Sequence, residues 1–449
     1  MAGFVTINPA TEEKIAEYQY QSDEAVAGNL GRCERGFEYI AKKSLSDRLK
    51  IISSVKLAVK ECKFKLSALM TEEMGKPLKE AQAEVEKINL LCEYYEQNAA
   101  AMLSQVNIDS KRSFRYEPMG TIFAIMPWNF PLWQVFRHAI PAIALGNNVA
   151  LKHADNTAGC AQAIESLFAD VCSDVVVNFR VTHQQAGEII KCRQIRGVTL
   201  TGSSRAGSQV ASLAGQFLKK SVLELGGSDA YLVLDGENIE KTVAVCSRAR
   251  LLNAGQTCIA AKRFIVIDKV FEDFVDRLCA QFKAVMVGDP KDSSSDMGPL
   301  ARKDIRDNAL AQQGDAISKG AQVVLESRPS EKGYYLTPGI LAGVEPGMSV
   351  FSEEVFAPIA VVMKVATVEE AIAVANDCRY GLGAAIFGAD EERCLSVASR
   401  LDVGNVAIND FVKSDPTLPF GGVKDSGYGR ELSAYGLYEF ANIKSYVLG

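Results

Sequence analysis

Strand-like and helix-like segments alternate along most of this chain, and that alternation constrains the possible fold more than any other feature. The strand-like segments of the first run lie at residues 120–126, 148–152, 175–179 and 197–200, and the helical ones at 137–145, 158–171 and 206–219. Such alternation predicts a parallel sheet with helices on both faces and a ligand site at the carboxyl ends of its strands.

The alternation restarts after residues 224–227, which indicates a second α/β domain. Its strand-like segments are residues 230–234, 262–267, 321–325 and 359–365, with a helix at 270–286. Before the first run, residues 23–103 have apolar positions at helical spacing. We expect a break at Lys76-Pro77, because proline cannot continue a helix. Residues 443–448 form a short apolar strand, which we expect to pair with a partner subunit's sheet.

The bulk properties indicate a globular protein of about two to four domains. The chain has 449 residues, of which 48% are hydrophobic and 23% charged, enough for large cores. A net charge of −6 argues against nucleic acid or an anionic membrane as the main partner. Residues 1–11 lack the pattern of a secretory leader. No apolar run approaches the roughly 18 residues that span a bilayer.

The cysteines and histidines exclude several classes of enzyme. The 11 cysteines include no CxxC pair, so a zinc ribbon or a thioredoxin motif is unsupported. Their odd number fits a reducing cytoplasm better than an oxidising compartment. The 3 histidines form no HExxH motif and no GxSxG elbow is present, which argues against zinc and serine hydrolases. We expect a cytoplasmic protein without a metal site.

Cys258 is the first candidate for catalysis. It follows Gly255-Gln256-Thr257 and precedes a run of small residues. A turn leading into a helix N-terminus at this point would lower the pKa of the thiol and activate it as a nucleophile. A buried structural role is the commoner outcome for any single cysteine, so the local sequence leaves both readings open.

Glu224 and Asn129 are candidates for a general base and an oxyanion donor. Glu224 lies between two leucines and before a diglycine, and burial at such a bend would raise its pKa. Asn129 lies in a rigid segment between Pro127 and Pro131, where its side-chain amide can point into a cleft. An ion-paired carboxylate and a purely structural turn explain these two segments equally well.

The segment Gly-Ser-Ser-Arg-Ala-Gly at residues 202–207 follows a strand and opens a helix. Small residues in that position let backbone N–H groups approach a phosphate. The segment matches neither Walker A nor GxGxxG, so by itself it favours an ordinary strand–helix turn.

Taken together, these segments resemble the aldehyde dehydrogenase superfamily along essentially the whole chain. The matching motifs, in the family's order, are MPWNFP at 126–131, LGNNVALKHA at 145–154, TGSSRAG at 201–207, LELGGSD at 223–229, GQTCIAAKRF at 255–264, EEVFAPI at 353–359 and PFGGVKDSGYGRE at 419–431. So many motifs in one order do not arise readily by chance. The KHA and GGSD variants and a short segment at 175–197 resemble the compact bacterial succinate-semialdehyde dehydrogenases.

The resemblance implies a covalent mechanism. Cys258 would attack the aldehyde carbon, while the amide of Asn129 and the backbone N–H of Cys258 hold the oxyanion. Hydride would pass to the nicotinamide of NAD(P), and Glu224 would deprotonate the water that hydrolyses the resulting thioester. A non-catalytic homologue is the alternative from another class of protein, and the presence of all three residues argues against it.

The resemblance also implies a path for the cofactor. Lys152 would contact the adenosine ribose, and Glu354 would hold the nicotinamide ribose with Phe356 packed nearby. Gly202 and Ser203 would form the pyrophosphate turn. The other residues expected along this path are Met126, Pro127, Trp128, Leu225 and Gly226.

Asp155, three residues after Lys152, bears on the choice of cofactor. NAD-preferring members of the family usually have glutamate there, and a carboxylate repels the 2′-phosphate of NADP. We therefore expect NAD or NADP, with a slight preference for NAD. His153 stands where the family usually has proline, which weakens that preference.

Arg137 and Ser414 are the residues expected to bind the substrate. Arg137 lies eight residues after Asn129, just over two helical turns. Succinate-semialdehyde dehydrogenases have an arginine at this spacing that pairs with the substrate carboxylate. Ser414 matches their serine contact, and Lys413 can assist. The alternative for Arg137 is a surface or interdomain ion pair.

Some members of the family have a second arginine six residues before the nucleophile. This chain has Leu252 at that position, and we expect nearby Arg250 to substitute for the missing charge. Ala260 replaces a second cysteine that some members carry, which argues against a local redox switch.

The expected architecture is α/β, with a Rossmann-like cofactor domain, a second α/β catalytic domain and a small β oligomerisation arm. We assign residues 1–100 and 119–226 to the cofactor domain, 227–425 to the catalytic domain, and 101–118 and 436–449 to the arm. The expected function is NAD(P)-dependent oxidation of succinate semialdehyde to succinate by a homodimer or homotetramer. Another short aliphatic aldehyde or semialdehyde is the alternative substrate.

Overall fold

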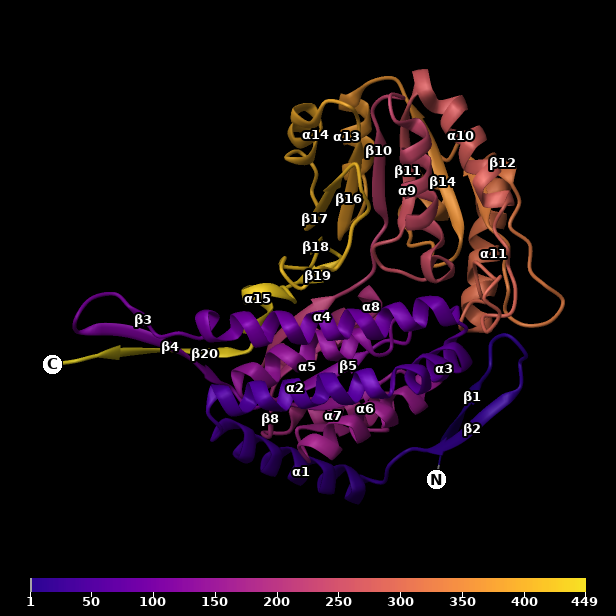
Figure 1. Ribbon diagram of the computed structural model, residues 1–449. Coiled ribbons are helices and arrows are strands. Elements are labelled where there is room, and N and C mark those ends of the chain that lie inside the picture. The colour runs from indigo at the N-terminus through magenta and orange to yellow at the C-terminus, as the bar shows by residue number, and fades with distance from the viewer. Residues whose placement is uncertain (1) are drawn as a thin grey trace.

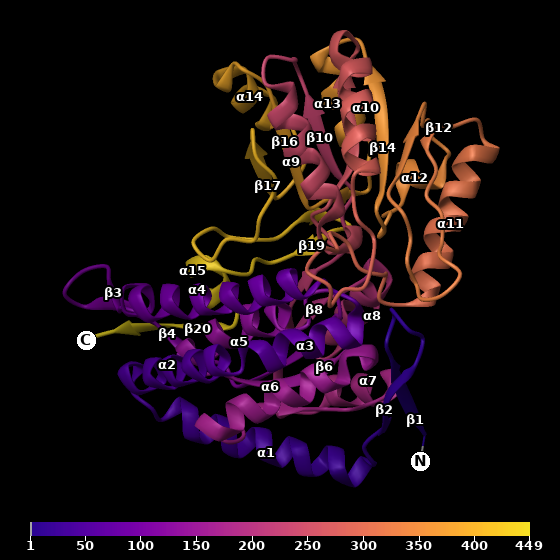
Figure 2. The ribbon, with the colours of Figure 1, turned by 45° about the vertical axis from the view of Figure 1, so that its right-hand side comes forward.

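The chain folds into two lobes, with an arm that projects from one side. The computed structural model describes residues 2–449. In Figure 1 the indigo and magenta N-terminal half forms most of the lower lobe, and the colours of the upper lobe run from mauve through orange to gold. The two lobes also stand apart after a turn about the vertical axis (Figure 2). Each lobe is built around its own sheet, which confirms the predicted α/β fold.

The lower lobe contains a six-stranded sheet. In spatial order its strands are β19 (Gly427–Tyr428), β9 (Lys220–Glu224), β8 (Ile195–Thr201), β5 (Thr121–Met126), β6 (Asn148–His153) and β7 (Val176–Asn178). Strands β5 to β9 pair in parallel, and β19 joins antiparallel to β9. Strand β5 is apolar and almost wholly buried, as expected for a parallel strand covered on both faces.

Helices cover both faces of this sheet. One face packs against α1 (Asp23–Ala41), α7 (His183–Lys191) and α8 (Ser204–Gln216). The other face packs against α5 (Trp133–Leu145) and α6 (Ala158–Val171), which are covered in turn by α2 (Leu45–Glu61), α3 (Lys63–Met74) and α4 (Leu78–Met102). The predicted break at Lys76-Pro77 is confirmed, because α3 ends at Met74 and Gly75 takes a left-handed φ of 77°.

The upper lobe contains a seven-stranded sheet. Its order is β12 (Gln322–Leu325), β13 (Gly339–Ala342), β14 (Ile359–Val365), β11 (Ala261–Ile267), β10 (Asp229–Val233), β16 (Gly383–Phe387) and β17 (Asn405–Ile408). Only β12 and β13 pair antiparallel. One face packs against α9 (Ile239–Leu251) and α10 (Asp268–Lys283), and the other against α11 (Lys303–Ser318), α13 (Val368–Asn376) and α14 (Glu391–Ala398).

The four strands predicted for the second run are confirmed as β10, β11, β12 and β14. The sequence pattern missed β13, β16 and β17, which are only four or five residues long. Strands β13 and β16 begin with glycine and contain alanine, and both residues are depleted in strands. Their central places in the sheet depend on neighbours distant in sequence.

The arm is a three-stranded sheet of β3 (Val106–Asn107), β4 (Arg112–Pro118) and β20 (Ala441–Val447). It projects to the left of the lower lobe in Figure 1. The tail strand predicted at 443–448 is confirmed as β20, but it pairs antiparallel with β4 of its own chain. Its second edge has no neighbouring strand within residues 2–449, and Ile443, Val447 and Leu448 are exposed there.

Several short elements lie outside the two large sheets and the arm. Strands β1 (Gly3–Ile7) and β2 (Lys14–Gln19) form a separate hairpin. The remaining short elements are α12 (Ser349–Ser352), β15 (Tyr380–Gly381), β18 (Val423–Lys424) and α15 (Ser433–Tyr438). After β17 the chain leaves the upper lobe, and β19 joins the lower sheet beside Glu224. This return brings residues 411–431 next to the segments that carry the candidate catalytic residues.

Candidate active site

Cys258 lies where two pockets meet between the lobes. The first pocket has a volume of about 640 Å³ and the second about 610 Å³, counting the space at their mouths that is open to solvent, and Cys258 lines both. The residues around the first pocket are Pro127, Trp128, Asn129, Thr201, Gly202, Ser203, Leu225, Gly226, Arg302, Ile305, Glu354 and Phe356. Most of the candidate catalytic and cofactor-binding residues therefore share one cavity. Trp128 and Phe356 meet edge to face within it, with ring centroids 5.7 Å apart.

The second pocket, on the other side of Cys258, contains both candidate substrate-binding residues. Its lining residues are Lys87, Phe130, Trp133, Gln134, Arg137, Ala249, Leu252, Thr257, Ile259, Phe411, Val412, Lys413, Ser414 and Phe420. It combines several aromatic rings with three cationic side chains. A pocket of this composition can take a short aliphatic chain that ends in an anion.

A strained turn holds Cys258 in place. Asn253, Ala254 and Gly255 all have left-handed φ angles, of 55°, 54° and 74°. A Cβ at Gly255 would lie 2.5 Å from the carbonyl oxygen of Ala357, so only glycine fits there. Asn253 donates from Nδ2 to the carbonyl oxygen of Asn129 at 2.8 Å, which ties this turn to the lower lobe. A strained backbone conformation of this kind persists only where contacts with the surrounding structure hold it in place.

Arg250 supports the same turn and does not reach the substrate pocket. Its buried guanidinium donates to the carbonyl oxygens of Gly255 and Val355, at 2.9 and 3.2 Å, and also to those of Ala261 and Ala357. The expectation that Arg250 substitutes for an arginine at Leu252 is therefore wrong. With both terminal nitrogens of its guanidinium directed to backbone carbonyls, it holds the cysteine turn in place.

The electrostatic environment of Cys258 differs from the one we expected. The residue precedes β11 and not a helix, so no helix N-terminus activates it. Burial raises the pKa of its thiol to about 12, although the positive charges of Lys262 and Arg137 act in the opposite direction. The expected lowering of this pKa is wrong. The thiol is protonated at neutral pH and must lose its proton as it attacks.

Asn129 lies between β5 and α5 and points at the cysteine turn. Its Nδ2 donates to the carbonyl oxygen of Gln256 at 3.0 Å. A primary amide carries two N–H donors, so one remains for a group in the pocket. The structure thus places an amide donor beside Cys258, as the motif around Asn129 predicted.

Glu224 is the last residue of β9 and is 2% exposed. Neither carboxyl oxygen has a hydrogen-bond partner within residues 2–449. Burial raises the pKa of Glu224 well above its ordinary value, while Arg137 lowers it and Glu431 raises it further. This agrees with the predicted direction. Glu224 lines neither pocket itself, but Leu225, the next residue, lines the first.

Arg137 forms a buried ion pair with Glu431, between Nε and Oε2. Its guanidinium lies over the ring of Phe420, 5.0 Å from the centroid, and donates weakly to Thr201 Oγ1 at 3.4 Å. The ion-pair alternative for Arg137 is therefore present in the structure, although the side chain also lines the substrate pocket. Its charge is largely compensated before any substrate binds.

Replacing Arg137 by alanine is expected to lower the free energy of unfolding by about 3–5 kcal/mol, because Glu431 would be left buried and unpaired. Denaturant unfolding compared with wild type measures the effect, and the exposed Arg205→Ala on α8 is the control. The double variant Arg137→Met, Glu431→Gln should recover part of the loss. Equal stabilities of the Arg137→Ala and Arg205→Ala proteins would contradict the expected role of the pair.

Ser414 accepts a hydrogen bond from Lys87 Nζ at 2.5 Å. Lys87 comes from α4 and is a pocket residue that the sequence analysis missed, because nothing in its helix distinguishes it from the other lysines there. Lys413 is half exposed and forms an ion pair with Asp410 at 2.5 Å. To assist in binding a substrate carboxylate as expected, Lys413 would have to exchange its ion pair with Asp410 for one with the substrate.

Three of the expected cofactor residues lie outside the first pocket. The Met126 side chain is buried in the apolar core of the lower lobe. Lys152 Nζ donates to the carbonyl oxygen of His153 at 3.2 Å and lies 3.5 Å from Asp155 Oδ1. Asp155 also accepts a hydrogen bond of 2.7 Å from the hydroxyl of Tyr20, just after the N-terminal hairpin. No local sequence pattern predicted this contact between Tyr20 and Asp155.

The first pocket fits a dinucleotide. Ser203 caps α8, and the positive end of this 13-residue helix opens beside the pocket. Gly202 has no heavy atom closer than 3.5 Å to where a Cβ would stand, so the backbone is accessible to a phosphate. On the opposite wall, Glu354 accepts from the backbone N–H of Gly227 at 3.2 Å and pairs with Lys262 at 3.3 Å. This arrangement offers an anion site and a fixed carboxylate.

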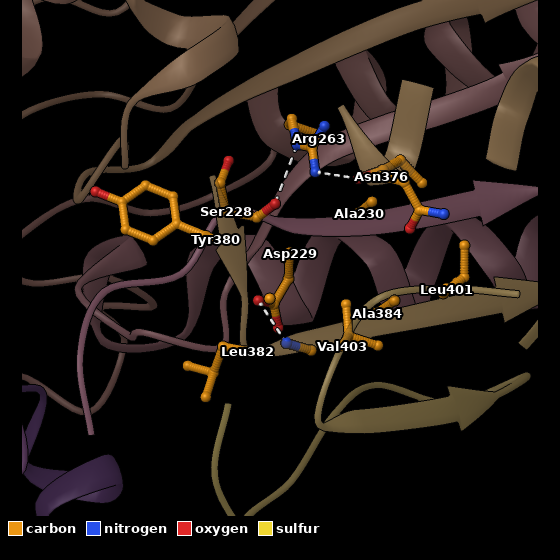
Figure 3. A pocket seen from close by; sticks show the side chains of 13 residues that line it. Ser228, Asp229, Ala230, Arg263, Asn376, Tyr380, Leu382, Ala384, Leu401 and Val403 are labelled. Carbon is orange, nitrogen blue, oxygen red and sulfur yellow. Dashed lines mark hydrogen bonds between the residues drawn. The ribbon is translucent and has the colours of Figure 1, made fainter. Parts of the chain in front are cut away.

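A separate, small polar pocket lies at the start of β10 (Figure 3). Arg263 donates from Nε to the carbonyl oxygen of Ser228 at 3.0 Å, and Asp229 accepts from the backbone N–H of Gly383 at 3.1 Å. Burial raises the pKa of Asp229 to about 7. These contacts anchor the turn at residues 225–227 to β11 and β16.

Two further classes of site are not seen in the described part of the chain. Across residues 2–449, no three or more side chains of the metal-binding types His, Cys, Asp and Glu come together in a group that could hold a metal ion. No helix in that range combines the length and the apolar character that crossing a membrane requires.

The chain is similar to known proteins over nearly its whole length. The model of the aldehyde dehydrogenase family matches residues 2–446. A succinate semialdehyde dehydrogenase of Escherichia coli, named for NAD(P)+, is 39% identical over 447 residues, which cover 98% of this chain and 97% of that protein. A succinate-semialdehyde dehydrogenase of Deinococcus radiodurans, named for NADP+, is 40% identical over 98% of this chain and 94% of its own length.

Solved structures agree with these relatives. A succinic semialdehyde dehydrogenase from Streptococcus pyogenes in complex with NADP+ superposes with a TM-score of 0.97 at 35% identity, covering 99% of both chains. Aldehyde dehydrogenase C from Pseudomonas syringae, with NAD+ and octanal, has a TM-score of 0.95 at 29% identity and covers 99% of this chain and 93% of its own. The chain therefore belongs to the aldehyde dehydrogenase family.

Proposed function

We propose that this aldehyde dehydrogenase oxidises succinate semialdehyde to succinate, with NAD or NADP as the hydride acceptor. The observation that carries the proposal is the position of Cys258 at the junction of a pocket that offers an anion site and a fixed carboxylate and a pocket with cationic side chains. Relatives about 40% identical over 98% of the chain are named succinate-semialdehyde dehydrogenases, which supports the choice of substrate.

Cys258 acts as the nucleophile in this proposal. Its sulfur bonds to the aldehyde carbon as the thiol proton passes to a solvent water, and the carbonyl oxygen becomes an oxyanion. The free N–H of Asn129 and the backbone N–H of Cys258 stabilise that oxyanion. Loss of hydride from the same carbon then leaves a thioester on Cys258.

Glu224 acts as the base that regenerates the enzyme. It accepts a proton from water, the hydroxyl adds to the thioester, and the acid leaves as the Cys258 thiol re-forms. Its two unpaired oxygens and its place directly before Leu225, which lines the first pocket, support this role.

The first pocket would hold the nicotinamide ribose and the pyrophosphate of the cofactor. When bound, NAD(P)+ supplies the hydride acceptor. The N-terminus of α8 with Gly202 and Ser203 would bind the pyrophosphate, Glu354 would hold a ribose, and Trp128 with Phe356 would exclude water. The other proposed contacts in this pocket are Pro127, Leu225 and Gly226. The proposed contacts outside it are Lys152, Asp155 and Met126, whose side chain is buried in the core.

Asp155 governs the choice between NAD and NADP. Its negative charge disfavours a 2′-phosphate, but Lys152 and Tyr20 both contact it and compensate part of that charge. The relatives are named for NAD(P)+ or NADP+. We therefore propose that both cofactors are used, and the slight preference for NAD stays a prediction.

A panel of aldehydes tested with NAD and with NADP checks the proposal. We expect kcat/KM for succinate semialdehyde to exceed that for butanal, which has a methyl group in place of the carboxylate, by about 10–100-fold, since one charge-assisted contact contributes about 1.5–3 kcal/mol. The absorbance of the reduced cofactor follows both reactions. Equal or higher efficiency with butanal would favour the second candidate, a dehydrogenase of plain short aldehydes. No reduced cofactor with any aldehyde would favour a non-catalytic homologue.

The arm and the cysteines support proposals about assembly and compartment. We propose a homodimer or homotetramer, because no strand of residues 2–449 pairs with the second edge of β20, whose Ile443 and Val447 are exposed, and such an edge can pair with another sheet. We propose a cytoplasmic location, because all 11 cysteines are free thiols, which suits a reducing compartment.

A further inference from the structure

Lys87 lies in the substrate pocket, where it contacts two residues that are distant from it in the sequence. It extends from α4 with its Nζ 4.0 Å from the centroid of the Trp133 ring and 2.5 Å from Ser414 Oγ. Both contacts are with residues that line the pocket together with Cys258. The ammonium group is therefore held at a defined place in the cavity where the aldehyde must lie.

Lys87 is also the cation of this pocket whose charge is not already paired. Three cationic side chains line the pocket, Lys87, Arg137 and Lys413. Arg137 is paired with Glu431, and Lys413 with Asp410. Within residues 2–449, no carboxylate oxygen lies within 4.0 Å of Lys87 Nζ. Its partners there are a neutral hydroxyl and an aromatic ring, which leave the charge available to an anion.

We propose that Lys87, together with the hydroxyl of Ser414, binds the carboxylate of the aldehyde substrate and is the main determinant of specificity for acid-bearing aldehydes. This inference rests on the proposed dehydrogenase function of the same site. It assigns Arg137 a different role, as the buried partner of Glu431. A carboxylate at Lys87 replaces none of the existing ion pairs and forms charge-assisted hydrogen bonds to both residues.

The groups around Lys87 make this binding sensitive to pH. Burial, together with the charge of Arg137 on α5, lowers the pKa of Lys87 to about 7. Glu84 on the same helix, Asp415 beside Ser414 and the Cys258 thiol act in the opposite direction. The ammonium form is complete below this pKa and is lost as the pH rises through it. Affinity for a carboxylated aldehyde must therefore fall above about pH 7, whereas affinity for an uncharged aldehyde does not depend on this group.

The first test needs no substitution. In the wild-type enzyme, KM for succinate semialdehyde is measured from pH 6 to 9 beside KM for butanal. We expect the ratio of the two KM values to rise with pH above about 7 and to approach a tenfold rise per pH unit. A ratio that stays constant over this range would overturn the proposal that a titrating lysine binds the carboxylate.

The second test replaces Lys87 by methionine, which keeps the length and apolar stem of the side chain. At pH 7 we expect kcat/KM for succinate semialdehyde to fall about 10–100-fold through KM, butanal to lose far less, and the pH dependence of the KM ratio to disappear. Lys87→Arg should restore binding and move the loss of affinity to higher pH. Lys79→Met is the matched control, since Lys79 lies on the same helix but outside the pocket and pairs with Asp296 on the surface.

The outcomes separate this inference from the proposed function. If wild type does not favour succinate semialdehyde over butanal, the proposed substrate is wrong. If wild type favours it and Lys87→Met keeps that preference, the assignment of Lys87 is wrong while the function stands. Equal losses for both aldehydes would show a structural role. If Lys87→Met does not fold, Lys87→Gln and the wild-type pH profile decide.

Discussion

Replacing Cys258 by alanine is expected to lower kcat for aldehyde oxidation by a factor on the order of 10⁴ or more, because no thiohemiacetal can form without the sulfur. The neighbouring structure should persist, since Arg250 and Asn253 hold the turn through backbone and amide contacts that do not involve the sulfur. The absorbance of the reduced cofactor with succinate semialdehyde measures the loss.

Cofactor binding should survive the same substitution. Trp128 lines the cofactor pocket and Trp133 the substrate pocket, and they are the 2 tryptophans of the chain. Their fluorescence can therefore report binding of NADP to the Cys258→Ala protein. Cys378→Ala, a partly exposed cysteine outside both pockets, is the control and should keep wild-type activity. Residual activity of Cys258→Ala above about 1% of wild type would show that the nucleophile lies elsewhere.

Replacing Glu224 by glutamine is expected to lower steady-state kcat by about 10²–10⁴-fold, the contribution that a positioned general base makes. The first turnover should still form about one reduced cofactor per chain in a burst, because the thioester forms before water is needed. Stopped-flow absorbance separates the burst from the slow phase. Glu353→Gln, an exposed carboxylate of the upper lobe paired with Arg379, is the control.

The pH dependence of kcat, compared between wild type and the Glu224→Gln variant, is a second test of Glu224 as the base. Burial holds the pKa of Glu224 well above its ordinary value, so a large fraction of the carboxyl remains protonated at pH values where a free glutamate is ionised. Hydrolysis needs the ionised form, and kcat should therefore rise with pH through this pKa and fall below it. The Glu224→Gln variant should lack this rise. Loss of the burst as well would contradict a role limited to hydrolysis and would place Glu224 at the deprotonation of Cys258.

Much of the fold could be predicted because its signals are local. The apolar character of β5 and β14 and the helical spacing of α6 are properties of consecutive residues, and their bounds agree closely with the predicted segments. Strands β13 and β16 were missed because their few small residues become strands only between neighbours in the sheet. The bounds of the domains remain a prediction.

The residues of the candidate site could be predicted from the sequence, but their environments could be predicted only in part. Motifs place Cys258, Asn129 and Glu224 correctly on turns and strand ends, and the structure brings Cys258 and Asn129 to one cavity with Glu224 next to its wall. The expected activation of Cys258 by a helix failed because the segment after it forms β11. The expected use of Arg250 failed because its guanidinium is consumed by backbone carbonyls that converge only in the folded chain.

The alternation of strands and helices and the ordered motifs were sufficient to determine the fold class, the family and the candidates Cys258, Glu224 and Asn129, because periodicity and motifs are written in consecutive residues. Only the tertiary structure decided which cations of the substrate pocket are free. Arg137 meets Glu431 and Lys87 meets Ser414 across hundreds of residues of intervening chain. Ionic pairing and burial depend on distances in space, so the charge that is open to a substrate appears only once the lobes and the returning segment have come together.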